Sequence, residues 1–288
     1  MSSSVSSRLL KSLKSFASRY RHNSHAVLGL GIFLFTLLVS IFAPQIATFD
    51  PEKVDIPKRL LPPDTTYLLG TDKLGRDIFS RMVWGTRVSM LIGFIASGLA
   101  TLIGITIGVV AGYFGGRTDW LLMRFVDMIL SIPTFFLVLL ASSLFGSNIY
   151  SVMVFIGLTL WPSIARIIRG MFLSFKERPF VDAATASGAK DFHISVIEIL
   201  PNAIYPAIVQ FSFLVGTAIL IEAGLSFLGL GEPNVISWGW MLNDALQTIN
   251  TAWWSSTFPG LAITLVIISF NMIGDGLNDA LNPKLKEG

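Results

Sequence analysis

The fold is decided by a polar interruption that reads Asp182-Ala183-Ala184-Thr185-Ala186-Ser187-Gly188 and is followed by Ile199-Leu200-Pro201. It lies within residues 176–201, between two apolar runs that are each long enough to cross a bilayer. A connection between neighbouring helices needs only about two to eight residues. The extra length, filled with small and charged side chains, therefore predicts a surface for a partner protein.

The residue types in this interruption suit a short helix that another protein can approach closely. Pro179 is favoured in the first turn of a helix, and Asp182 complements the positive end of the helix dipole. The alanines that follow are small, Gly188 permits a sharp turn, and Pro201 marks the entry to the next span. An ordinary amphipathic linker between two spans is the alternative interpretation.

The composition is that of a chain solvated largely by lipid. Of its 288 residues, 52% are hydrophobic and 14% are charged, whereas soluble domains carry about 25% charged residues. The length suits one membrane domain without a second globular domain. There is no Cys, and the three His are too few and too scattered for a metal cluster. We expect no cleavable signal peptide, because the first apolar run is longer than a signal core.

Six apolar runs approach the roughly 20 residues that a transmembrane helix needs. The sequence therefore predicts an all-α membrane protein with six transmembrane helices. The third span should be kinked at Pro133, and the fourth should be interrupted at Trp161-Pro162. The expected spans are Ala26–Phe42, Val88–Tyr113, Leu121–Phe145, Ile149–Ile168, Ala203–Leu228 and Thr257–Ile273.

The distribution of Lys and Arg predicts the orientation in the membrane. With a cytoplasmic N-terminus and six spans, both termini are inside, and 14 of the 21 basic residues fall on the cytoplasmic side. The other seven lie in one outside loop, where acidic residues nearly balance them. The domains expected are a basic cytoplasmic tail at 1–25, a first span with its external loop at 26–85, and a permease domain at 86–282. The last outside loop carries Trp238, Trp240, Trp253 and Trp254, which should prefer the membrane interface.

Several motifs, taken together, resemble the second permease subunit of dipeptide and oligopeptide ATP-binding-cassette (ABC) importers. The resemblance covers residues 26–286, and the interruption resembles that family's ATPase-coupling loop, with Asp182 where the family usually has Glu. The motifs are Leu69-Gly70-Thr71-Asp72-Lys73-Leu74-Gly75-Arg76-Asp77-Ile78-Phe79-Ser80-Arg81, Ala111-Gly112-Tyr113-Phe114-Gly115-Gly116, Glu222-Ala223-Gly224-Leu225-Ser226-Phe227-Leu228-Gly229-Leu230-Gly231 and Gly274-Asp275-Gly276-Leu277-Asn278-Asp279-Ala280-Leu281-Asn282-Pro283.

The resemblance implies a multi-pass protein of the inner cell membrane with the type I ABC importer fold. Its implied partners are a homologous permease, two cytoplasmic ATPases that bind ATP and Mg²⁺, and an external substrate-binding protein, with no nucleic acid. The chain itself would hold no cofactor and no metal, and would be the path of a pump whose motor lies elsewhere. The loop at 176–201 would couple the two through Asp182, Ala183, Ala184, Gly188, Ile199, Leu200 and Pro201.

Small residues recur every four positions along the second span. Gly104, Gly108 and Gly112 share one helix face, which lets another helix approach closely. The approaching helix belongs either to this subunit or to a partner permease.

Glu222 is the candidate for the translocation path. An ionisable side chain inside a span is costly and is therefore a functional suspect. Ala223 and Gly224 beside it should leave room for water or for a cationic group of the substrate. The alternatives are a hydrogen-bonded structural carboxylate and one that already lies at the interface.

Motifs that are missing argue against an enzyme. The sequence has no Gly-x4-Gly-Lys-Ser/Thr phosphate loop and no His-Glu-x-x-His metal motif. A nickel or metal-chelate importer remains the nearest alternative within the class. An ion-driven secondary transporter is the alternative from another class, although the intramembrane ion ligands and inverted repeats it would need are not evident.

Overall fold

The computed structural model describes residues 17–281, and over that range its regular structure is helical except for one isolated bridge between Thr71 and Asp77. Five helices are long and apolar enough to cross a membrane. The bent pair α5 (Gly116–Leu130) and α6 (Thr134–Phe145) passes the same test when its two helices are taken together, and it counts as a sixth span if the pair crosses the membrane as one unit. The all-helical fold is confirmed for the described residues, which hold five to six candidate spans where the sequence predicts six. The five single helices are α2 (Ser24–Ile41), α4 (Ile78–Phe114), α7 (Ile149–Lys176), α10 (Tyr205–Phe227) and α12 (Trp254–Leu281).

Helix α4 begins ten residues before the expected span because Asp77 caps it. Asp77 Oδ2 accepts hydrogen bonds from the backbone N–H of Ser80 at 2.8 Å and from the Ser80 hydroxyl at 2.6 Å. The helix has 37 residues and is therefore about 55 Å long. It exceeds the roughly 30 Å hydrocarbon core of a bilayer and links the two ends of the molecule.

Two prolines act differently on the third and fourth spans. At Pro133 the third span breaks, and α5 and α6 meet at an angle of 81°. At Pro162, by contrast, α7 continues as one helix, so the expected interruption there is wrong. Prolines are tolerated inside membrane helices where neighbouring packing and local adjustment compensate for the lost hydrogen bond.

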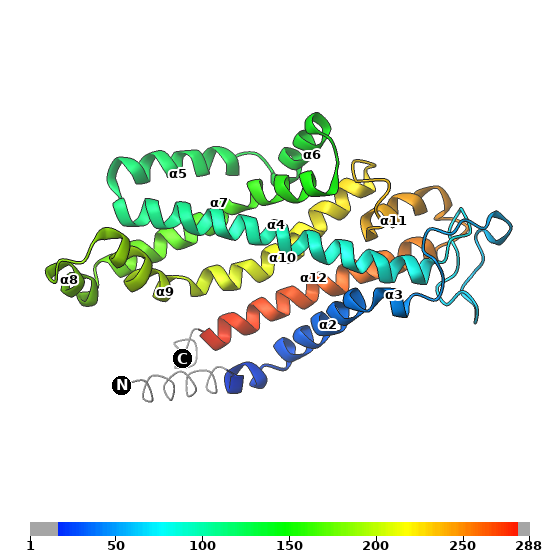
Figure 1. Cartoon of the computed structure of the whole chain (residues 1–288), viewed down its shortest axis with the longest axis horizontal. Coiled ribbons are helices and arrows are strands. Elements are labelled where there is room, and N and C mark those ends of the chain that lie inside the picture. The colour runs from blue at the N-terminus through cyan, green and yellow to red at the C-terminus, as the bar shows by residue number, and fades with distance from the viewer. Residues whose placement is uncertain (1–16, 282–288) are drawn as a thin grey trace.

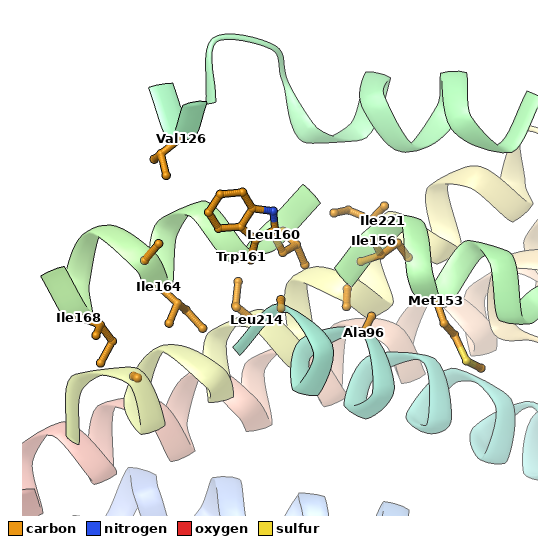
Figure 2. Packing of buried hydrophobic residues seen from close by; sticks show 14 of the residues in the cluster. Ala96, Val126, Met153, Ile156, Leu160, Trp161, Ile164, Ile168, Leu214 and Ile221 are labelled. Atoms are coloured by element: carbon orange, nitrogen blue, oxygen red, sulfur yellow. The ribbon is translucent and has the colours of Figure 1, made fainter. Parts of the chain in front are cut away.

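The main core lies between α4 and α7 and extends to α10 (Figure 2). Ile164 and Ile168 project from α7 into this core and are fully buried. A Cβ added at Gly104 would lie 2.7 Å from Ile164 Cβ, and one at Gly108 would lie 2.7 Å from Ile168 Cβ. At Gly112 the added atom would be 2.5 Å from Phe172 Cβ. The structure therefore places the small-residue face of α4 against α7 of the same chain.

Helices α2 and α12 form a second packed pair. The Ser269 hydroxyl of α12 donates a hydrogen bond of 2.8 Å to the Gly29 carbonyl of α2. Gly29 has no side chain, and a Cβ there would lie 2.7 Å from Met272 Cβ. Helix α10 contacts α4, α7 and α12, so it joins the two parts of the bundle.

The bundle has two different ends (Figure 1). The coupling end carries α8 (Pro179–Ala186), the π-helical turn η2 (His193–Ile199) and α9 (Leu200–Ala203). The opposite end, here called the α11 end, carries α3 (Ala43–Ile46), α11 (Trp238–Ala245) and the short helices η1 (Ile56–Lys58) and η3 (Leu246–Thr248).

The first and last spans have their outer ends at the same end of the bundle, as the expected topology requires. Helix α2 begins and α12 ends on the side of the bundle that holds the coupling end (Figure 1). The side of the membrane that this end faces remains a prediction. Most of the basic tail at 1–25 and the terminal Lys284 and Lys286 lie outside the described residues.

Candidate functional site: the coupling segment and the buried carboxylate

The expected short helix in the interruption is α8. Pro179 is its first residue, and Asp182 lies in its first turn. After the helix, Gly188 adopts a φ of +79°, a conformation that side chains with a Cβ rarely take. The N–H of Gly188 donates to the Thr185 carbonyl at 3.0 Å, and the next N–H donates to the Ala184 carbonyl at 3.1 Å. This pair of hydrogen bonds is a Schellman motif, which ends the helix sharply.

One face of α8 is anchored and the other is open. Val181 is buried and packs in the core at the base of α7. Asp182, Ala183 and Gly188 are exposed, and Ala184 is half-buried. An exposed surface of small side chains next to a carboxylate is suited to close approach by another protein.

The Ile199-Leu200-Pro201 part of the motif has a different role. Ile199 is fully buried in the main core, Leu200 is half-buried, and Pro201 is exposed in the first turn of α9. The structure therefore separates the predicted coupling residues into a displayed set in α8 and an anchoring residue, Ile199.

A second anchor joins the coupling segment to α4, and sequence reasoning missed it. The Tyr113 hydroxyl donates to Asp191 Oδ1 at 2.8 Å. Lys176 Nζ donates to the Tyr113 carbonyl at 2.7 Å and lies 5.5 Å from the centre of its ring. Tyr113 lies within the Ala111–Gly116 motif, but nothing in that motif indicates a partner 78 residues away.

Ion pairs also tie α5 to α7 toward the coupling end. Arg169 forms a two-bond ion pair with Asp119, in which Nε donates to Oδ1 and Nη2 donates to Oδ2. Arg166 pairs with Asp127. Arg124 and Asp127 lie three residues apart in α5, a spacing that allows a pair on one helix face, yet Asp127 is paired with Arg166 of the neighbouring helix.

Glu222 lies in α10 near the α11 end and is 5% exposed. Its Oε1 accepts hydrogen bonds from the hydroxyls of Ser226 at 2.7 Å and Ser237 at 2.8 Å. Its Oε2 is buried and finds no hydrogen-bond partner among residues 17–281. Both partners are neutral hydroxyls, and no basic side chain in the described part of the chain pairs with this carboxylate.

The space next to Glu222 is not where the sequence suggested. A Cβ added at Gly239 would lie 2.5 Å from Ala223 Cα, and a Cβ added at Gly224 would lie 3.0 Å from the Phe135 ring. Packing therefore fills the room that was expected beside Ala223 and Gly224. A small cavity lies instead on the side of Ser226 and Ser237, and the volume that the centre of a water molecule can occupy in it is about 10 Å³. That is enough for about one water. Glu232 lines the same cavity and accepts a 3.3 Å hydrogen bond from the Ile149 N–H.

Two of the four tryptophans expected at the membrane interface are buried instead. Trp238 is 2% exposed and donates from Nε1 to the Met82 carbonyl at 3.1 Å. Trp254 is 6% exposed and donates to the Thr71 carbonyl at 3.2 Å. Trp253 is 56% exposed, as an interfacial residue would be. No group of three or more His, Cys, Asp or Glu that could hold a metal ion is found between residues 17 and 281.

The helical fold belongs to a class of multi-span membrane proteins, and the comparisons with known proteins identify that class as the membrane subunits of ABC transporters. The family described as the binding-protein-dependent transport system inner membrane component matches residues 104–287. A second family, the N-terminal TM domain of oligopeptide transport permease C, matches residues 12–63. The chain therefore belongs to the inner membrane components of binding-protein-dependent transport systems.

Individual relatives agree with this assignment. A dipeptide transport system permease protein of Alkalihalophilus pseudofirmus is 40% identical over 267 residues, which are 92% of this chain and 88% of the relative. One from Haemophilus influenzae is 38% identical and covers 96% of each chain. An oligopeptide transport system permease protein of Bacillus subtilis is 37% identical over 98% of this chain and 93% of the relative.

The fold also has a solved neighbour. An inward-facing structure of the MetNI methionine ABC transporter contains a chain that superposes with a TM-score of 0.54 at 18% identity, covering 68% of this chain and 93% of that one. This similarity supports the fold of an ABC importer transmembrane domain.

Proposed function

We propose that this chain is one of two homologous permease subunits that form the path of an ATP-driven importer for di- and oligopeptides. An external binding protein delivers the peptide. Two cytoplasmic ATPase subunits bind ATP and Mg²⁺, and the chain itself holds neither. The proposal places it in the inner cell membrane with both termini and residues 170–201 in the cytoplasm. Labelling from outside of a single Cys introduced at position 190 would contradict that orientation.

The observation that carries the proposal is the way the coupling segment is built. Helix α8 displays Asp182 and Ala183, while Ile199 and Tyr113 fix the segment to the base of α7 and to the end of α4. A partner that moves α8 would therefore move both helices of the main core. Because α4 is about 55 Å long, that motion reaches the α11 end, where Glu222 lies.

Glu222 supports the peptide part of the proposal. A carboxylate inside a span costs roughly 2–3 kcal/mol or more on insertion scales unless protein, water or substrate compensates it. Here two hydroxyls partner one oxygen and the other is left free beside a water-sized cavity. We infer that the free oxygen meets the cationic end of a passing substrate.

Purification of the full assembly tests this function. The tagged chain, extracted from its native membrane, should bring with it a second permease and two ATPases, and the ligand held by the associated binding protein should be a mixture of short peptides by mass spectrometry. A bound metal chelate in place of peptides would assign the chain to the nickel or metal-chelate branch of the class. Recovery of the chain without any ATPase would contradict the proposal.

A further inference from the structure

A buried arginine at the start of α4 lacks strong partners. Arg81 is 3% exposed, yet its contacts are long: 3.4 Å to the Pro51 carbonyl, 3.4 Å to Asp244 and 3.8 Å to Asp72. Its neighbour Arg76 reaches the same two carboxylates at 2.6 and 2.7 Å. Strong charge-assisted hydrogen bonds are about 2.7–2.9 Å long. Arg81 is therefore buried with its donors poorly used.

The surrounding charges do not balance. Arg76, Arg81 and Lys73 share two carboxylates, those of Asp72 and Asp244. Arg81 also lies in the first turn of α4, where the partial positive charge of the helix dipole disfavours a cation. Helix stability therefore does not account for Arg81. Among the groups within ion-pair distance of one another, three cations meet two carboxylates, and a third carboxylate, Glu52, lines the adjacent pocket without pairing with Arg81.

A pocket opens beside this cluster at the α11 end. It has a volume of about 350 Å³ and is lined by both arginines, by Trp240 and by residues 233–236. Pockets for small ligands typically have a few hundred Å³ and a few converging polar groups. The exposed Glu52 also lines the pocket but does not come within ion-pair distance of Arg76 or Arg81. Its carboxylate is therefore placed to compete with an anion that enters the pocket.

We propose that this pocket binds the C-terminal carboxylate of the transported peptide, with Arg81 as its principal partner. The proposal rests on the proposed function, since it takes the substrate to be a peptide. A guanidinium presents two parallel N–H donors that match a carboxylate. The peptide carboxylate supplies a further anion for Arg81, and Glu52 competes with it.

The same segment of chain connects this pocket to the acidic cavity. Glu232, Val235 and Ser237 line the cavity that holds Glu222, while Val235 and its neighbours line the arginine pocket. The step from Glu232 to Val235 is three residues, and three residues of extended chain span at most about 11 Å. A short extended peptide is of similar length, so its ammonium group points to the acidic cavity while its carboxylate contacts Arg81. The chain thereby orients a peptide by both of its charged ends.

The test compares one tripeptide as the free acid and as the C-terminal amide. Binding protein saturated with each form is given to the complete importer in proteoliposomes, and uptake is expressed per loaded binding protein, so its own preference cancels. Wild type should transport the amide about tenfold more slowly than the free acid, a ratio that corresponds to a free-energy difference of about 1.4 kcal/mol. Arg81→Gln should slow the free acid to the rate of the amide, whereas Glu52→Gln should widen the difference.

Lys73→Gln is the matched control, because Lys73 carries a charge in the same cluster but does not line the pocket. It should keep the difference between the two peptides. Equal transport of acid and amide by wild type would overturn the site, even if Arg81→Gln failed to assemble. So would an equal loss of both forms in an assembled Arg81→Gln importer. Uptake of neither form by wild type would be the failure of the proposed function itself.

Discussion

The Tyr113 hydroxyl donates a 2.8 Å hydrogen bond to Asp191, and so the last turn of α4 is joined to the segment that follows α8. This contact lies at the coupling end, where Lys176 also binds the Tyr113 carbonyl. Helix α8 is thus attached to α7 through the chain and to α4 through Tyr113. Because α4 and α7 are packed closely through glycines, we expect the pair to move as one body when α8 moves.

Replacement of Tyr113 by Phe tests that attachment. The change removes the hydroxyl but keeps the ring under Lys176, and it should weaken the junction by about 1 kcal/mol. We expect fewer peptides imported per ATP hydrolysed, with hydrolysis largely retained. The measurement is the ratio of the two rates in proteoliposomes. Tyr150→Phe, at a position 69% exposed, is the control and should leave the ratio unchanged.

The turn at Gly188 provides a second prediction. A β-branched residue at a φ of +79° is strained by about 1–2 kcal/mol, although nothing lies within 4 Å of an added Cβ. Gly188→Val should therefore distort the end of α8 and release the ATPase while the spans stay folded. Gly188→Asn should retain more association, because Asn tolerates this conformation. Co-purification of the ATPase measures both, and full association and transport by Gly188→Val would disprove the coupling assignment.

The contact between α4 and α7 predicts opposite effects at two glycines of one helix. A Cβ at Gly108 would lie 2.7 Å from the Ala165 carbonyl oxygen, so Gly108→Ala should destabilise the protein by about 1–3 kcal/mol. At Gly98 no atom lies within 4 Å, so Gly98→Ala should be neutral or slightly stabilising. Thermal unfolding in detergent compares the two. Equal melting temperatures would mean that the helices are not packed this closely.

The Glu222→Gln variant distinguishes a role of Glu222 in the translocation path from a structural role. The amide keeps the shape and an acceptor for Ser226 or Ser237 but removes the charge. We expect peptide uptake to fall while abundance and assembly stay normal, as judged by membrane yield and co-purification. A collapse in abundance would show that the carboxylate is structural. Unchanged uptake would place it outside the path.

The regular parts of this molecule could be predicted from local sequence. Apolar runs marked the candidate spans, and Pro179 and Gly188 marked the two ends of α8, because helix starts and glycine turns depend on neighbouring residues. The tolerance of Pro162 inside α7 could not be predicted, since it depends on packing against another helix. Contacts between distant residues were also out of reach, as at Tyr113 and Asp191, or Arg166 and Asp127.

The candidate site divides in the same way. The residue type of Glu222 made it a suspect, and its partner Ser226 lies one turn further along the same helix, but its second partner, Ser237, comes from a loop that folds back onto α10 and lines the cavity. One of the two ion pairs of Arg76 is local, because its partner Asp72 lies four residues away in the sequence. Its second pair, with Asp244, joins residues 168 apart and creates the buried cluster around Arg81.

The most direct measurement is ATP-dependent uptake of a labelled dipeptide into proteoliposomes that contain this chain with its second permease, its ATPases and its binding protein. We predict uptake only when ATP, Mg²⁺ and all four components are present, and neither ATP hydrolysis nor uptake by the chain alone. Uptake by the isolated chain driven by an ion gradient, or undiminished uptake by an assembly that lacks the chain, would contradict its assignment as the path of an ATP-driven peptide importer.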